Sequence, residues 1–285
     1  MVPTVRYTAI LCALAALACA SCEYGLHEAF WRSNAVDVRA AQMAEVSEPD
    51  TLGGAQQYAV VIITDTHYGK GYEPLDDRFI ASLKKQPNVK FVISLGDCVD
   101  HGLGTEVAQY AAFIERIKVE CGLPVYSVVG NHDLYNSGWS KWQEQVAARH
   151  AYTSCYHFTT NDTFSWYFLD NASGTFGRKQ LAVMKEKMET DTRPKFVFAH
   201  IPLYSQLDRG SYFSLQNERE GNQVISLFAR TNVRMMCAGH THRNEQNDLG
   251  KLKLYTIGTF MKSRMAMLHV DESADTVTVQ YVKIK

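Results

Sequence analysis

Five short polar motifs in the chain of 285 residues carry side chains that bind metal ions. Neutral imidazole nitrogen and carboxylate oxygen suit borderline first-row ions such as Zn²⁺, Mn²⁺ and iron. Each motif begins directly after an apolar segment of the chain. The sequence therefore predicts a metal site, and its candidate ligands are Asp65, His67, Asp97, Asn131, His200, His240 and His242.

The apolar segments have the pattern of strands in an α/β domain. In the first half of the chain, runs rich in β-branched residues alternate with helical patterns, which is typical of a parallel sheet with crossover helices. In such folds ligands bind at the carboxyl ends of the strands, where the five motifs stand. We expect strands at 58–64, 89–95, 124–129, 156–160, 164–170, 195–199, 233–238, 254–259, 265–270 and 276–283, and helices at 36–46, 76–86, 104–121, 180–190 and 222–230.

The last three expected strands are closely spaced, which favours antiparallel pairing among them. The chain then has two β-rich halves, each with helices available to cover a sheet. We predict an α/β fold, a four-layer α-β-β-α sandwich of two stacked mixed β-sheets flanked by helices.

The order of the motifs resembles that of the calcineurin-like metallophosphoesterase superfamily. Its pattern is D-x-H, G-D-x-x-D, G-N-H-D/E, a lone His and G-H-x-H, and all five blocks stand here in that order from Asp65 to His242. The glycines suit a backbone that leaves a strand in a tight turn close to an ion. The first and last blocks are most similar to the cyclic-nucleotide phosphodiesterase-like branch, whose members cleave varied substrates.

The resemblance implies a binuclear centre with two divalent or trivalent ions, Mn, Fe or Zn. Each ion would have three ligands of its own, and one carboxylate would bridge the two ions. The first set would be Asp65, His67 and His242, the second Asn131, His200 and His240, and the bridge Asp97.

The resemblance also implies a mechanism for hydrolysis of small phosphate esters, monoesters or diesters. A water held between two ions roughly 3.5–4 Å apart would lose a proton and attack phosphorus in line as hydroxide. His132 would protonate the leaving alkoxide, a task that suits a group titrating near pH 7. Asp100 would orient the ring of His132 and fix its tautomer.

Three further residues are candidates for contacting the substrate. His101 follows Asp100 at a position where some relatives have an arginine that grips phosphate, so the analogy to protein serine/threonine phosphatases is weakened. Tyr204 and Arg209 lie in a polar stretch that would form either a lid or a solvated loop. The alternative functions are a non-catalytic metal-binding scaffold or surface protein that reuses the fold, a cyclic-nucleotide phosphodiesterase and a nuclease.

Composition and charge narrow the possible classes of function. A hydrophobic fraction of 46% and a charged fraction of 21% are typical of globular proteins. The formal net charge of −1 gives no field that would attract nucleic acid, which argues against a nuclease. The cysteines after residue 22 have no metal-finger spacing, and their pairing stays open for Cys98, Cys121, Cys155 and Cys237.

The first 22 residues have the features of an export signal. Arg6 precedes an apolar run of roughly 13 residues, which is short for a membrane-spanning helix, and small residues follow it. Cys22 resembles the lipidated cysteine of bacterial lipoproteins, with Cys19 as the alternative and a simple cleaved signal or uncleaved anchor as the other interpretation. We expect an exported, membrane-anchored lipoprotein of the periplasm or cell envelope, with an extension or tether over 23–57 and the catalytic domain over 58–285.

Overall fold

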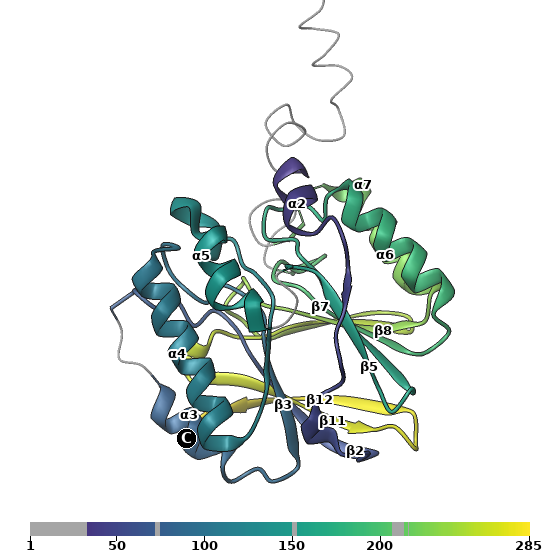
Figure 1. Cartoon of the computed structure of the whole chain (residues 1–285). Helices are drawn as coiled ribbons and strands as arrows, with labels where there is room; N and C mark the ends of the chain where they lie inside the picture. Colours follow the sequence, from purple (N-terminus) through teal and green to yellow (C-terminus); the bar gives the residue numbers. More distant parts are fainter. Residues whose placement is uncertain (1–32, 72–74, 150–152, 207–213, 216) are drawn as a thin grey trace, which may run out of the picture.

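Two β-sheets stack face to face in the computed structural model, which describes residues 33–71, 75–149, 153–206, 214–215 and 217–285 (Figure 1). Helices cover the outer face of each sheet. The predicted α-β-β-α sandwich is therefore confirmed. The expected signal segment 1–22, with Cys19 and Cys22, lies outside the described residues, as does Arg209.

The five-stranded sheet has the order β12-β11-β2-β3-β4. Its centre is β2 (Gln57–Ile63), which runs parallel to β3 (Val89–Ser94), and β3 runs parallel to β4 (Val125–Ser127). On its other side β2 pairs antiparallel with β11 (Arg264–Asp271), which in turn pairs with β12 (Thr276–Lys283). All residues of β2 except the first are buried, because both faces of this strand are covered. That burial explains its continuous apolar sequence.

The seven-stranded sheet has the order β1-β5-β6-β7-β8-β10-β9. Four of its strands, β6, β7, β8 and β10, run parallel to one another, and β5 and β9 pair antiparallel at the two sides of this group. The bounds are β1 Ala44–Glu45, β5 Tyr156–Thr160, β6 Phe164–Phe168, β7 Lys195–Phe198, β8 Val233–Ala238, β9 Glu245–Leu249 and β10 Leu252–Thr256.

Three apolar layers hold the sandwich together. The layer between the sheets is rich in aromatic rings, and Phe91 of one sheet meets Trp166 of the other edge-to-face at 5.2 Å between ring centroids. The helices pack on the outer faces in two groups, seen on opposite sides of the sheets in Figure 1. On the five-stranded sheet lie α3 (Asp76–Leu83), α4 (Gly104–Cys121) and α5 (Gly138–Gln145), and on the seven-stranded sheet α2 (Ser33–Arg39), α6 (Arg178–Thr190) and α7 (Glu218–Arg230).

The C-terminal part differs from the expectation in its pairing. The strand expected at 254–259 is β10, and it pairs with β8 in the seven-stranded sheet rather than with β11. The 3-10 helix η5 (Phe260–Lys262) lies between β10 and β11, where the chain crosses from one sheet to the other. A link this short is as compatible with a hairpin as with a change of sheet, so spacing alone gave the wrong pairing. The polar hairpin strand β9 lacks the apolar alternation of a strand and was not predicted.

Residues 33–45 pack on the seven-stranded sheet. Helix α2 lies against α6, and β1 pairs with β5. The guanidinium of Arg39 donates to both carboxylate oxygens of Asp170, at 2.8 and 3.1 Å, in a buried contact. The four described cysteines Cys98, Cys121, Cys155 and Cys237 are free thiols. Within the described part of the chain, no helix is both long and apolar enough to span a bilayer.

Candidate metal centre and its surroundings

The five motifs lie at the carboxyl ends of strands from both sheets. Strands β2, β3 and β4 lead into the first three motifs, and β7 and β8 lead into the last two. The motifs meet across the gap between the sheets, because Asn131 after β4 contacts His200 after β7. Parallel strands bring their carboxyl ends to one edge, so short motifs far apart in sequence converge there.

The local backbone is shaped for this convergence. Five candidate ligands have left-handed backbone dihedrals, with φ between 45° and 68°, which side chains other than glycine rarely adopt: Asp65, His67, Asp97, His240 and His242. Such strain is concentrated at functional sites, where the surrounding fold enforces it. Close approach of two motifs also requires Gly130, because a Cβ there would lie 2.0 Å from the backbone nitrogen of Asp97.

The first group of candidate ligands consists of Asp65, His67 and His242. The Nε2 atoms of the two histidines lie 3.3 Å apart, and Asp65 Oδ1 lies 3.2 Å from His242 Nε2 and 4.0 Å from His67 Nε2. Asp65 Oδ1 is fully buried, yet it accepts no hydrogen bond from any described residue. A buried carboxylate oxygen without a donor is costly unless a cation satisfies it. This group therefore fits a metal ion.

The second group surrounds His200 Nε2. This atom lies 3.0 Å from Asn131 Oδ1, 3.2 Å from Asp97 Oδ2 and 3.2 Å from His240 Nδ1. One ring nitrogen carries at most one hydrogen and cannot satisfy three such neighbours. His200 Nδ1 lies 2.7 Å from the backbone oxygen of Leu95, a pure acceptor, so Nδ1 carries a proton and Nε2 is the nitrogen that can bind metal once its own proton leaves. The second group also fits an ion.

Asp97 lies between the two groups. Its Oδ2 is 3.2 Å from His200 Nε2 of the second group and 3.9 Å from His67 Nε2 of the first. Its Oδ1 accepts the backbone N–H of His132 at 2.8 Å, which helps to hold the carboxylate in this position. This position agrees with the bridging role that the resemblance implies.

Electrostatics in the metal-free chain follow from burial and from these contacts. Burial lowers the pKa of His67 and outweighs Asp97 and Asp65, so this ring stays neutral and can bind metal. Burial would also lower the pKa of His200, but Asp97 outweighs it and raises that pKa to about 9. The pKa of Asp97 is held below its usual range because His200 outweighs the effect of burial. When no metal is bound, His200 of the second group is therefore protonated at neutral pH.

Asp100 orients a metal ligand as well as the proposed acid. Its carboxylate Oδ1 accepts from His67 Nδ1 at 2.9 Å, whereas His132 Nδ1 lies 3.7 Å from that carboxylate. The backbone carbonyl of Asp100 accepts from His132 Nδ1 at 2.7 Å. Asp100 therefore contacts His132 mainly through its backbone oxygen, and its carboxylate lies closer to His67. The expectation that the Asp100 side chain orients His132 stays a prediction.

The surroundings of His132 contain groups that the motifs did not predict. The Tyr135 ring lies 4.7 Å from the His132 ring between centroids, and its side chain is exposed. Lys70 donates to Asp100 Oδ1 at 3.4 Å. Both come from turns beside the motifs, and aromatic or cationic type was the only sequence signal for them. The Asp133 carboxylate stabilises the turns of the second and third motifs, since it accepts the backbone N–H groups of Val99 and Gly130.

The substrate candidates occupy different positions. His101 is exposed beside Asp100, and Glu106 accepts from its ring nitrogen at 3.1 Å. Tyr204 is exposed in the loop that follows His200.

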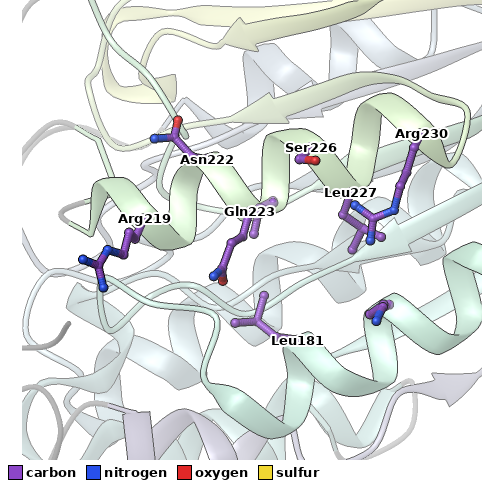
Figure 2. A pocket seen from close by; sticks show the side chains of 9 residues that line it. Leu181, Arg219, Asn222, Gln223, Ser226, Leu227 and Arg230 are labelled. Atoms are coloured by element: carbon purple, nitrogen blue, oxygen red, sulfur yellow. The ribbon is translucent and has the colours of Figure 1, made fainter.

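Two hollows are relevant to ligand binding. One, of about 770 Å³, is lined by His242 and therefore adjoins the candidate metal centre. The other, of about 510 Å³, is a groove between α6 and α7, where Leu181 faces Gln223 and Leu227 (Figure 2). None of the candidate ligands lines this groove. Of these two hollows, the first is therefore the one next to the candidate metal centre.

Fold and candidate ligands together define a metallophosphoesterase. Residues 58–244 match the family model of the calcineurin-like phosphoesterases, and the chain belongs to this family. No curated protein matches the chain. The more specific resemblance to the cyclic-nucleotide phosphodiesterase-like branch stays a prediction.

Solved structures share the fold at low sequence identity. A dimetal phosphatase from Danio rerio is 15% identical with a TM-score of 0.59, and the match covers 80% of this chain and 99% of that one. GAP50, the anchor in the inner membrane complex of Plasmodium, is 15% identical with a TM-score of 0.57, covering 80% and 89%. A putative 5'-nucleotidase from Staphylococcus aureus is 13% identical with a TM-score of 0.53, covering 80% and 54%.

Proposed function

We propose that the chain hydrolyses small phosphate esters at a two-metal centre. One ion would be held by Asp65, His67 and His242, the other by Asn131, His200 and His240, and Asp97 would bridge them. The observation that carries the proposal is the convergence of two groups whose donor atoms lie within 4.8 Å of one another, Asp65 with His67 and His242, and Asp97 with His200 and His240. Asn131 joins the second group because its Oδ1 lies 3.0 Å from His200 Nε2. The buried Oδ1 of Asp65, which accepts no hydrogen bond from a described residue, supports the proposal.

Bound ions would supply charge to clamp the phosphoryl group and would lower the pKa of an attacking water. The protein side chains have separate tasks. Asp100 keeps the proton of His67 on Nδ1, so that Nε2 faces the first group. The backbone oxygen of Asp100 accepts a hydrogen bond from the proton on His132 Nδ1. The proton that His132 would give to the leaving alkoxide is therefore the one on Nε2.

Turnover of p-nitrophenyl phosphate and bis-p-nitrophenyl phosphate tests this function and separates monoesters from diesters. Protein reconstituted with Mn²⁺, Ni²⁺ or Zn²⁺ should hydrolyse at least one of them, lose activity in chelator and regain it on adding metal. A panel of nucleotides, cyclic nucleotides, phospholipid head groups and sugar phosphates then narrows the substrate. A folded, metal-bound protein that releases phosphate from none of these would be a non-catalytic scaffold, and the proposal would be wrong.

We further propose that the protein is exported and anchored in a membrane through a lipidated Cys22 or Cys19. This part of the proposal rests on the sequence of residues 1–22 alone. Mass spectrometry of the mature N-terminus should find a lipid-modified cysteine as the first residue. An intact Met1 on a soluble cytosolic protein would contradict both export and anchoring.

A further inference from the structure

The hollow that adjoins His242 is lined by a concentration of positive charge. Four of its lining residues are cationic, namely Arg243, Lys262, Arg264 and Lys283. They come from three segments: the turn after β8, the region of η5 and the start of β11, and the end of β12. Arg264 and Lys283 are direct partners across the β11–β12 pair. We call this hollow the cationic pocket.

No carboxylate balances these charges locally. None of the residues that line the cationic pocket is acidic, and none of its four cations forms an ion pair with a carboxylate that the structure describes. The whole chain, by contrast, has 29 Lys and Arg against 30 Asp and Glu. Like charges gathered in a concave surface focus the field and attract an anion.

Arg264 is held in place within this pocket. Its Nη1 donates to the backbone oxygen of His242 at 3.4 Å. Its side chain passes over Gly258, where an added Cβ would lie 2.5 Å from Arg264 Cδ. The Asn244 side chain accepts the backbone N–H of Gly258 at 2.6 Å and fixes that turn. A guanidinium with a fixed direction is suited to an anion with several oxygens, such as phosphate or carboxylate.

The cationic pocket and the candidate metal centre share one residue. His242 points its Nε2 toward Asp65 and His67 and also lines the pocket. A volume of about 770 Å³ is within the range of small-molecule sites. Because His242 belongs to both places, a molecule with one end at the metal centre would have its other end toward the cationic pocket.

We propose that the cationic pocket binds a second anionic group, a phosphate or a carboxylate, of the ester that is cleaved at the metal centre. This inference rests on the proposed phosphoesterase function and adds the substrate class. The substrate is a phosphate ester with a further anionic group along its length, rather than an ester of an uncharged alcohol.

Paired substrates of equal length test the inference. Alkane-1,n-diol bisphosphates with two to six carbons are compared with the monophosphates of the same diols, which keep the leaving group and lack the second anion. With wild-type protein, kcat/KM for the bisphosphate should exceed that for the monophosphate by about tenfold or more at the best length, beyond the statistical factor of two. Dicarboxylic analogues, with a carboxylate in place of the distal phosphate, show which anion is preferred.

Variants then locate the effect in the pocket. Lys262→Gln, Lys283→Gln and Arg264→Gln should each lower the bisphosphate-to-monophosphate ratio, by roughly 1.5- to 5-fold per exposed charge removed. The two lysines are exposed, so their loss leaves the fold intact if Arg264→Gln proves unstable. Lys118→Gln is the matched control. This exposed lysine lies near the C-terminal end of α4, and no residue of that helix lines the cationic pocket.

A second readout does not depend on turnover. Alkane bisphosphonates, which are not hydrolysed, should bind metal-reconstituted protein more tightly than the matching monophosphonates in isothermal titration calorimetry. Lys262→Gln and Lys283→Gln should reduce that difference, and Lys118→Gln should not.

The outcomes are distinguishable. Turnover of both esters with a ratio near two overturns the inference alone and leaves the phosphoesterase function standing. A high ratio that Lys118→Gln lowers as much as the pocket variants do also overturns the inference, because the preference would then come from long-range electrostatics and not from the pocket. No turnover of either ester contradicts the proposed function and, with it, the inference.

Discussion

The metal centre and the cationic pocket share His242 but are built in opposite ways. In the centre the side chains of Asp65, His67, Asp97 and His200 are at most 3% exposed, and hydrogen bonds fix them from behind. In the pocket Arg243, Lys262 and Lys283 are exposed and have no carboxylate partner among the described residues. The buried ligands of the centre are thus held by their contacts, whereas the exposed cations of the pocket can adjust to the shape of an anion. Changes in the centre should abolish the reaction, and changes in the pocket should alter which ester is preferred.

The largest effect is expected at Asp97. Asp97→Ala removes the carboxylate that lies between the two ligand groups, so binding of both ions should be weakened and kcat/KM should fall roughly 10⁴-fold. Inductively coupled plasma mass spectrometry and kinetics measure the two effects together. Circular dichroism checks that the variant is folded. Retention of two ions would refute the bridging position.

His132→Ala should reduce kcat by about 10²- to 10⁴-fold, because the leaving alkoxide loses its proton donor. The metal content should stay as in wild type, since His132 belongs to neither of the two proposed ligand sets and its Nδ1 bonds the backbone oxygen of Asp100. His132 also clusters with His67 and Asp100, so loss of an ion in this variant would assign it a ligand role instead. Esters with a good leaving group such as p-nitrophenol should be affected less than alkyl esters. Equal losses on both kinds of ester would show that His132 is not the acid.

Asp100→Ala tests which histidine the carboxylate serves. Asp100 Oδ1 lies 2.9 Å from His67 Nδ1 but 3.7 Å from His132 Nδ1. Loss of the carboxylate should therefore lower the affinity for the ion that His67 binds by about 10- to 100-fold. Metal titration followed by activity measures this loss, and excess metal should restore most of the rate. A rate that stays low at saturating metal, with unchanged affinity, would instead return the carboxylate to His132.

The stability of the metal-free protein should depend on pH through His200. Its pKa is raised to about 9 in the folded chain, above the usual value near 6.5. The corresponding stabilisation is complete below pH 6.5 and is lost as the pH rises through about 9. The thermal midpoint in chelator should therefore fall by several degrees between pH 6.5 and 9.5. Added metal should stabilise more at the higher pH, because no proton then has to leave. A midpoint that rises with pH in chelator would contradict this.

The smallest effect is expected for salt. Raising the ionic strength screens exposed charges more than buried ones. The preference for a bisphosphate over a monophosphate should therefore decline a few-fold between about 0.05 and 0.5 M salt, while kcat for p-nitrophenyl phosphate changes less. An equal decline for both would mean that the pocket is no more exposed to solvent than the centre.

The difference between the metal centre and the cationic pocket also explains what the sequence could and could not predict. Asp65, Asp97 and His240 each follow a buried strand, so a local pattern fixes where their side chains converge. Arg264 belongs to no motif, and its position depends on which sheet β10 joins and on the space above Gly258. The partner of the Asp100 carboxylate depends on a rotation of one side chain between two histidines. Pairing of distant segments and side-chain direction are tertiary properties, and spacing does not encode them.

The central claim is that this site binds two ions and that both are needed. Metal-free protein should be titrated with Mn²⁺ or Zn²⁺ while bound metal and phosphate release from p-nitrophenyl phosphate and its diester are followed in the same samples. We predict two ions bound per chain and activity that reaches its plateau only as the second site fills. Full activity with one ion, or activity that persists in excess chelator, would contradict the two-metal account.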